Sequence, residues 1–359
     1  SVESMQNSVN FYKDKPIFGL DIGHNTLKVM QSEFTRDKFS VVGYGISGFP
    51  AEAIVDGVVK DYEALAKAAN NLFDNHIIGK VTSHRVAMSI PAAKTYARTI
   101  VLPVLKDKEI DDAVQTEAEQ YIPIPIEDLY VDYTIISRND QGIEVLAVGA
   151  PKKIVDSYSN FAKIIGLEPV GFDTSILSAA RLFQKQDQHS NIPAILIDFG
   201  SISTDITVHD KTVILTSTMS KGGDMFTDTI AKTLNINDQE AHIVKTKYGI
   251  GKSKKQNEII EVLKPTIDQM VKEIQRMVRY YEERSGTTDK IGQIVSMGGG
   301  ANMPGLSEYL TSSLRLPVRT CEPFQNLSLH KLRVPSPLER SIYVTAAGLS
   351  LIEPKELFS

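Results

Sequence analysis

Two aspartates lie in matching surroundings in the two halves of the chain. Asp21 belongs to segment 17–30, which reads IFGLDIGHNTLKVM, and Asp198 belongs to segment 194–208, which reads AILIDFGSISTDITV. In both, an apolar run is followed by Asp-x-Gly, a small polar turn and a second β-prone run, and this pattern predicts a β-hairpin. Backbone N–H groups in tight turns can bind a phosphate chain, and carboxylates beside them can hold Mg²⁺ through its water molecules.

The spacing of the two hairpins supports this interpretation. Asp21 and Asp198 are 177 positions apart in a chain of 359 residues, which is close to half its length. Either hairpin alone would more often be an ordinary turn, whereas a half-length repeat suggests two similar lobes, each built around its own sheet. A chain of this length also exceeds the size at which one hydrophobic core usually keeps growing. We therefore expect two lobes whose hairpins face a common cleft.

A glycine-rich loop near the end of the chain is a third candidate for binding. The run 296–305 reads SMGGGANMPG, follows an apolar strand and opens a helix. Glycines let the backbone approach a flat ring closely, and the start of a helix presents free N–H groups. Because this loop follows the two hairpins in the chain, we expect it to contact an adenosine.

Composition restricts the classes of function. The formal net charge is −5 and there is no long basic stretch, so no nucleic-acid partner is predicted. The single cysteine, Cys321, cannot form an internal disulfide, which is typical of a reducing compartment. No apolar run approaches the roughly 20 residues that span a bilayer, and the polar start lacks the core of a secretory signal. We expect a cytoplasmic protein whose association with a membrane is peripheral and made through partners.

The sequence between the hairpins predicts a compact α/β insertion. Residues 107–121 place apolar side chains at helical spacing, and Pro123 and Pro125 end that helix. The other predicted elements of this segment are strands over 129–136 and 143–150 and a helix over 154–165.

A long amphipathic helix is predicted after the second hairpin. Over 257–283, apolar residues recur every three or four positions, with Pro265 in the first part. Such a stripe packs more often in a core than against a coiled-coil partner. The shorter elements predicted around it are helices over 226–234 and 239–248, a strand over 291–296, a helix from Pro304 and a final helix near 341–351.

The three motifs occur in an order that is familiar from one superfamily. LDIG at 20–23, LIDFGSISTDI at 196–206 and SMGGGANMPGL at 296–306 resemble the phosphate-1, phosphate-2 and adenosine motifs of the actin, Hsp70 and sugar-kinase superfamily. This resemblance covers nearly the whole chain. It implies an α/β, actin-like (ribonuclease H-like) two-lobed fold that binds ATP or ADP with Mg²⁺.

Two further segments point to one branch of that superfamily. EAEQYIPIPIEDL at 117–129 and GGGANMPGLSEYLTSSLRL at 298–316 are similar to the PilM family of type IV pilus assembly proteins, the branch that also contains FtsA. The resemblance implies an ATP-binding scaffold, at most a slow ATPase, at the inner face of the cytoplasmic membrane. Its implied partners are the N-terminal tail of the membrane protein PilN and other inner-membrane components of the pilus platform.

The resemblance also implies which residues form the site. Asp21 and Asp198 would be the catalytic carboxylates and would face Mg²⁺ through water. The remaining implied nucleotide-binding residues are Gly23, His24, Asn25, Thr26 and Lys28 in the first phosphate loop, Gly200, Ser201, Ser203 and Thr204 in the second, and Lys245, Gly298, Gly299, Gly300 and Met303 around the adenosine.

Two residues depart from the superfamily pattern. A Glu-x-x-Lys pair often contacts ribose and adenine, and here the same position reads His242-Ile-Val-Lys245, so the lysine is kept and the glutamate is not. His24 stands where a small serine is usual in the first phosphate loop. An imidazole at that place would alter phosphate geometry or hydrolysis.

The resemblance further implies four subdomains. Their implied boundaries are 15–95 for 1A, completed by about 169–190 and 335–359, 96–168 for the 1C insertion, 191–222 and 286–334 for 2A, and 223–285 for 2B.

Two alternative functions belong to the same fold. The first is a filament-forming division protein like FtsA, which ends in a basic amphipathic membrane helix, whereas this chain ends in the short, acidic IEPKELFS. The second is a sugar or metabolite kinase, which needs a carboxylate base such as Asp198 or Asp173, but no sugar-binding signature accompanies them. The sequence determines neither the oligomeric state nor whether ATP is hydrolysed.

Overall fold

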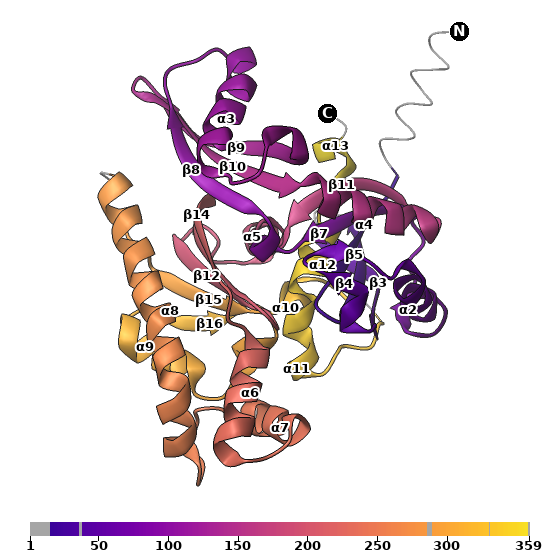
Figure 1. The fold of residues 1–359 in the computed structure, drawn as a ribbon, viewed down its shortest axis with the longest axis vertical. Coiled ribbons are helices and arrows are strands. Elements are labelled where there is room, and N and C mark those ends of the chain that lie inside the picture. The colour runs from indigo at the N-terminus through magenta and orange to yellow at the C-terminus, as the bar shows by residue number, and fades with distance from the viewer. Residues whose placement is uncertain (1–14, 36–37, 286–288, 330, 358–359) are drawn as a thin grey trace.

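The computed structural model describes residues 15–35, 38–285, 289–329 and 331–357. Within these ranges the chain forms two lobes, each built around a mixed β-sheet, and a smaller α/β insertion at one end of the molecule (Figure 1). No helix in these ranges combines the length and the apolar character that a membrane span needs.

The first lobe contains a six-stranded sheet in the order β11-β7-β1-β2-β3-β6. β1 and β2 form the first predicted hairpin, and β7 and β11 extend the sheet in parallel beyond β1. The bounds of these strands are β1 (Phe18–Ile22), β2 (Thr26–Thr35), β3 (Lys38–Gly48), β6 (Ile77–Gly79), β7 (Arg85–Ile90) and β11 (Glu168–Thr174).

The second lobe repeats this arrangement in a five-stranded sheet, β14-β13-β12-β15-β16. β12 and β13 form the second predicted hairpin, β14 continues it antiparallel, and β15 and β16 extend the sheet in parallel beyond β12. The internal repeat read from the two Asp-x-Gly segments is therefore a repeat of sheet topology. The bounds are β12 (Ala194–Phe199), β13 (Thr204–Asp210), β14 (Thr212–Met219), β15 (Gln293–Met297) and β16 (Val318–Thr320).

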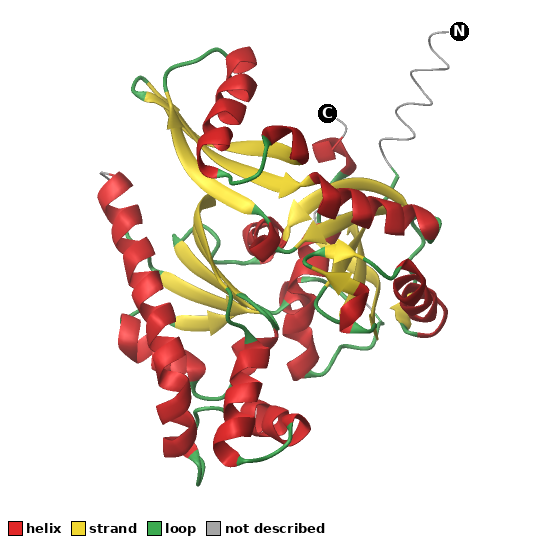
Figure 2. Cartoon of the chain, in the orientation of Figure 1, coloured by secondary structure: helices red, strands yellow, loops and turns green. Residues whose placement is uncertain are grey.

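Helices cover the outer face of each sheet (Figure 2). The predicted long helix is α8, and its apolar stripe is core: Leu263, Ile267 and Ile274 are buried against Ile197 and Ile206 of the second sheet. On the first lobe, Leu72 of α2 and Phe161 of α4 belong to the core of that sheet. The bounds are α2 (Tyr62–Asn75), α4 (Lys152–Ile164), α6 (Gly223–Leu234), α7 (Asp238–Lys247), α8 (Gln256–Ser285) and α9 (Leu306–Leu314).

Two helices, α5 (Ser175–Gln186) and α12 (Val344–Ser350), lie between the lobes, and one buried cluster joins them to both sheets. They touch closely because Gly348 has no side chain: a Cβ there would collide with the carbonyl of Ser178. On the other side, a Cβ at Gly19 of β1 would collide with Ala346 of α12. The end of the chain therefore packs on the first hairpin.

The insertion consists of α3 (Asp107–Tyr121) and a three-stranded sheet in the order β8-β10-β9. β8 (Tyr96–Leu102), β9 (Leu129–Asn139) and β10 (Gly142–Pro151) pack with Ile110 and Val114 of α3 into a small core. The helix and both strands predicted here are confirmed, and β9 runs three residues beyond the prediction.

Gly305, at φ 85°, delays the helix predicted from Pro304 until Leu306, because the left-handed backbone cannot continue into a right-handed helix.

The remaining elements are short. The short elements are β4 (Ile54–Val55), β5 (Val58–Val59), α10 (Pro323–Asn326), α11 (Pro337–Arg340), α13 (Pro354–Leu357), and the 3₁₀ helices η1 (Ala51–Ala53), η2 (Ala92–Lys94), η3 (Ile126–Asp128), η4 (Gly299–Asn302) and η5 (Ser341–Tyr343).

Candidate functional site

Asp21 lies next to the turn of the first hairpin, buried between two polar neighbours. The register of the hairpin places Lys28 directly opposite, and Lys28 Nζ donates to Asp21 Oδ2 at 2.5 Å. Ser89, from the end of the adjacent strand β7, donates its hydroxyl to Asp21 Oδ1 at 2.7 Å. A buried carboxylate with both oxygens bonded is held in one orientation, so the side chain is prepositioned.

In the second hairpin, the register of β12 and β13 places a second carboxylate, that of Asp205, directly opposite Asp198. Burial, together with the charges of Asp205 and Asp21, raises the pKa of Asp198 to about 7, and the charge of Lys28 opposes this shift. Burial also raises the pKa of Asp205 to about 6, although Thr218 and Ser175 donate hydrogen bonds to it. Because Asp21 and Lys28 act on Asp198, the two hairpins face one another.

Asp205 was not among the predicted site residues. Its signal was present in the sequence, because the second hairpin reads Ser203-Thr204-Asp205 after the turn. What the sequence could not show is the concentration of negative charge that Asp21, Asp198 and Asp205 create together. Among the described residues, no three carboxylate, imidazole or thiol side chains lie close enough together to hold a metal ion directly, so a cation here would be held through its water molecules.

The two predicted phosphate loops close in the same way. Gly23 N–H donates to the carbonyl of Thr26 at 2.8 Å, and Gly200 N–H donates to the carbonyl of Ser203 at 2.9 Å. In the described part of the chain, no hydrogen bond engages the N–H groups of the intervening His24, Asn25 and Ser201. All three residues are exposed, so these donors are available to an anion.

The predicted adenosine loop lies directly against the second hairpin. β15 runs parallel to β12 with Met297 beside Asp198, and the loop begins at Gly298 with φ 79°. A Cβ at Gly298 would collide with Asp198 Oδ1, and one at Gly300 would lie 2.7 Å from Phe199 Cβ. Glycine is therefore required there by close approach and not by turn geometry alone.

Met303 lies differently from the other residues of this loop. Its side chain is 5% exposed and belongs to the core of the second lobe, against Gly249. Its apolar thioether is stabilised by that packing. Any contact of Met303 with a ligand would be confined to the little surface that remains.

The start of α6 also lies at the second phosphate loop. Gly223 N–H donates to the carbonyl of Gly200, and Asp224 N–H donates to the carbonyl of Ser201, both at 2.9 Å. A Cβ at Gly222 would collide with the backbone of Ser201. The pair Gly222-Gly223 in front of an amphipathic helix was the available sequence signal, and it was missed.

Lys245 is brought to the same place. Although it lies on α7, its Nζ donates to the carbonyl of Gly223 and to Thr227 Oγ1, each at 2.8 Å. The side chain is buried, and burial lowers the pKa of the ammonium group. His242, one turn earlier, is exposed and makes no comparable contact in the described chain.

Asp173, the second candidate for a kinase base, is paired with a cation. Arg181 of α5 forms an ion pair with it at 2.7 Å. Burial raises the pKa of Asp173, and the guanidinium opposes that shift. This ion pair joins β11 to α5.

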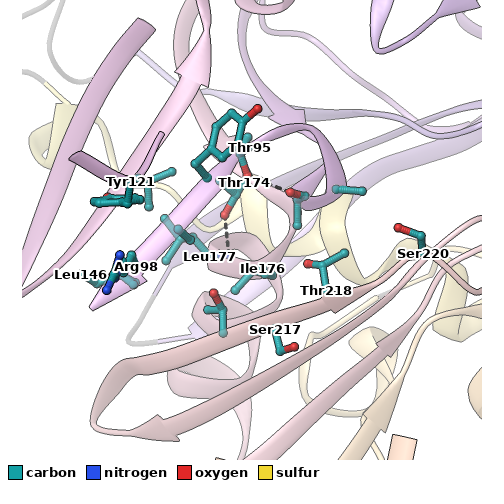
Figure 3. A pocket seen from close by; sticks show the side chains of 16 residues that line it. Thr95, Arg98, Tyr121, Leu146, Thr174, Ile176, Leu177, Ser217, Thr218 and Ser220 are labelled. Carbon is teal, nitrogen blue, oxygen red and sulfur yellow. Dashed lines mark hydrogen bonds between the residues drawn. The ribbon is translucent and has the colours of Figure 1, made fainter. Parts of the chain in front are cut away.

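A hollow of about 320 Å³ lies where the insertion, α5 and the end of β14 meet (Figure 3). Arg98 of β8 lies over the ring of Tyr121, with its guanidinium carbon 5.0 Å from the ring centroid. The hydroxyl of Tyr121 is buried and has no hydrogen-bond partner among the described residues. The lining residues are Ala92, Ala93, Thr95, Tyr96, Ala97, Arg98, Tyr121, Leu146, Val148, Thr174, Ile176, Leu177, Thr216, Ser217, Thr218 and Ser220.

Comparison with solved structures shows the fold. The chain superposes on a PilM–PilN type IV pilus biogenesis complex with a TM-score of 0.80 at 21% identity, covering 94% of this chain and 98% of that one. It superposes on MreB 5 of Spiroplasma citri bound to AMPPNP with a TM-score of 0.55 at 14% identity, covering 95% and 97%. The expected actin-like two-lobed fold is confirmed.

Comparison with known sequences shows the family. The cell division protein FtsA of Streptococcus pneumoniae serotype 2 (strain D39 / NCTC 7466) is 24% identical over 86% of this chain and 75% of its own length. A family model described as type IV pilus assembly protein PilM matches residues 19–353, which is nearly the whole chain. The chain belongs to the PilM family of type IV pilus assembly proteins.

Proposed function

We propose that the chain is a cytoplasmic, ATP-binding scaffold of the type IV pilus platform that holds the N-terminal tail of PilN at the inner face of the membrane. The observation that carries the proposal is the hollow beside Tyr121. It is lined by the insertion, by α5 and by the end of β14, and the solved relative with the TM-score of 0.80 is a PilM–PilN complex. An extended tail of a few residues suits a groove of this size and shape.

The walls of the hollow suit a peptide. Leu146, Ile176 and Leu177 supply apolar surface, and the buried Tyr121 hydroxyl lacks a partner that a peptide carbonyl would supply. A buried hydroxyl without a partner costs about 1–3 kcal/mol, which a ligand that accepts its hydrogen bond recovers. Other components of the platform would be reached through this PilN contact.

The second part of the proposal is a nucleotide with Mg²⁺ between the two hairpins. The residues fit: exposed N–H groups of His24, Asn25 and Ser201 would bind phosphate oxygens, and Lys28 would add a positive charge. Asp21 and Asp198 would hold the hydrated metal, whose charge would offset their mutual repulsion with Asp205. Gly298 and Gly299 would leave room for the adenosine. Any hydrolysis of ATP at this site would be slow.

We further propose the subdomain boundaries given by the resemblance. The separate three-stranded sheet supports the 1C insertion over 96–151 of its proposed 96–168, whereas α4 packs in the core of the first lobe. The completion of 1A by 335–359 is supported by the packing of α12 on β1. The nearly complete PilM match favours a role in pilus assembly over the filament-forming role of FtsA.

Tyr121→Phe tests the site of the tail. We expect a synthetic N-terminal tail of PilN from the same organism to bind the intact protein, and the variant to bind it about fivefold more weakly, because one hydrogen bond is lost. Isothermal titration calorimetry measures both affinities.

Tyr133→Phe is the matched control for this experiment. Its hydroxyl bonds Asp111 on the same insertion, outside the hollow, so tail binding should not change. No binding of the tail to the intact protein would overturn the proposed function, and equal losses in both variants would place the tail elsewhere.

Lys245→Met tests the predicted nucleotide contact. Loss of the two bonds to α6 should loosen the Gly222-Gly223 turn and weaken ATP binding about fivefold, and should lower the free energy of unfolding by about 1–2 kcal/mol. A fluorescent ATP analogue and urea denaturation measure the two effects. Lys247→Met, which removes an exposed lysine from the same helix, should change neither. A Lys245 variant with full ATP affinity would show that this lysine only supports α6.

A further inference from the structure

A second hollow, of about 790 Å³, lies on the opposite side of β14, between the end of that strand and α8. It shares Ser217, Thr218 and Ser220 with the hollow of Figure 3, so the two together flank the last residues of β14. Leu215 and Met219 pack toward the core that contains α8, and the alternation of a strand places Thr216 and Thr218 on the other side. The end of the strand is therefore a wall that both hollows share.

The wall contributed by α8 is basic. Lys272, Arg276 and Arg279 recur at the spacing of one helix face, and Lys221 joins them from the end of β14. The single carboxylate of the lining is Glu273, and Arg276 binds it with bonds of 2.6 and 2.9 Å. Lys221 Nζ is held by Gln269 at 2.8 Å. Positive charge therefore remains in excess, in a chain whose net charge is −5.

Two of the basic residues of α8 that line the hollow have no ion-pair partner within 4 Å among the described residues. In the first part of α8, lysines pair with acids along the helix, Lys255 with Glu258 and Lys264 with Asp268. Lys272 and Arg279 have no such ion pair in the part of the chain that the structure describes. The exposed ammonium of Lys272 and guanidinium of Arg279 are therefore available to a negatively charged ligand.

The edge of β14 gives that ligand a shape. β14 is the last strand of its sheet, and the insertion covers only its first half, where Thr99 donates to the carbonyl of Ile214. Beyond that contact, alternate backbone groups of residues 216–219 point away from β13, and no strand of the described residues pairs with them on that side. An open edge of this kind pairs with an extended chain, which a compact phosphate cannot do.

We propose that the outer edge of β14 and the basic face of α8 form a docking groove for an extended, acidic segment of another protein. Its backbone would add a strand at residues 216–219, and its carboxylates would pair with Lys221, Lys272 and Arg279. The basic face of α8 lies outside the hollow assigned to the PilN tail, but residues 217, 218 and 220 line both hollows, so the two ligands would border each other.

The test uses a fluorescein-labelled short peptide that alternates glutamate with threonine. We expect it to bind the full chain in a salt-dependent way, and to bind the double variant Lys272→Glu/Arg279→Glu about tenfold more weakly, because attraction is replaced by repulsion. Lys252→Glu/Lys254→Glu makes the same change of charge at exposed loop positions outside the groove and should retain binding. Fluorescence anisotropy gives the affinities. The single variants Lys272→Gln and Arg279→Gln should each lose less affinity than the double variant, and their affinities should still fall as the salt concentration rises.

Two further peptides separate the parts of the proposal. A peptide with N-methyl groups on alternate backbone amides should bind more weakly if a strand is added, and one with lysine in place of glutamate should not bind. The proposal would be overturned if the two double variants lost equal amounts of affinity for the peptide. It would also be overturned if the N-methylated peptide bound fully and pyrophosphate displaced it, because attraction between charges would then explain the binding. Salt-sensitive self-association that the groove variant abolishes in sedimentation would identify a second copy as the occupant and would also overturn it.

Discussion

Asp198→Asn should weaken the Mg²⁺-dependent part of ATP binding by about 10- to 100-fold, the range expected when a group that orients a metal is lost. Asp198 lies where the second phosphate hairpin, the adenosine loop and Asp21 meet, and the amide keeps the shape of the carboxylate without its charge. Titration of a fluorescent ATP analogue with and without Mg²⁺ measures this component. Asp21→Asn should act in the same direction.

Protein stability distinguishes this effect from unfolding. Burial and the charges of Asp205 and Asp21 raise the pKa of Asp198, so its ionised form is costly in the protein without ligand. The free energy of unfolding of Asp198→Asn at pH 8 should therefore equal or exceed that of the parent. Asp228→Asn, at an exposed position of α6, removes the same charge outside the cleft and should bind normally. Metal-dependent binding that survives in Asp198→Asn would remove Asp198 from the site, and no binding by the parent would describe a scaffold without nucleotide.

His209→Leu should stabilise the protein, most of all in mild acid. His209 of β13 is fully buried against Phe183, and neither ring nitrogen has a hydrogen-bond partner in the described part of the chain. Burial lowers the pKa of His209 to about 4, and the nearby Asp210 opposes the shift only in part. An unpartnered buried polar group costs about 1–3 kcal/mol, which leucine avoids at similar volume.

The pH dependence has a definite sign. Between the ordinary value of 6.5 and about 4, the unfolded chain binds a proton that folded His209 does not, so acid destabilises the parent through this residue. Across this pH range the free energy of unfolding of the parent should fall by about 3 kcal/mol relative to that of His209→Leu. Asp198 and Asp205, whose pKa values are raised, contribute with the opposite sign in both proteins, so the difference isolates His209.

Urea denaturation of both proteins at several pH values measures the difference. His189→Gln is the control, because that histidine is 61% exposed and its loss should leave the profile of the parent unchanged. Parallel stability curves for the parent and His209→Leu would show that His209 is protonated in the folded protein, contrary to this interpretation.

The local features of the candidate site could be predicted from the sequence. Asp-x-Gly turns between β-prone runs produced both hairpins, because turn residues and strand periodicity act over a few neighbouring positions. The stripe of α8 likewise predicted a core helix, and half-length repetition predicted two sheets of the same topology. Within each hairpin the turn sets the strand register, which places Lys28 opposite Asp21 and Asp205 opposite Asp198.

Other features of the candidate site depend on contacts between segments that are far apart in the sequence, so only the tertiary structure decided them. Asp205 gains its raised pKa from burial beside Asp198, Lys245 reaches the second phosphate loop across α6, and Met303 is drawn into a core instead of lying open. Neither hollow beside β14 could be read from spacing, because each is lined by segments that packing brings together from the insertion, α5 or α8. Sequence periodicity specifies which face of an element is buried, but the partner of that face is chosen by packing across the whole chain.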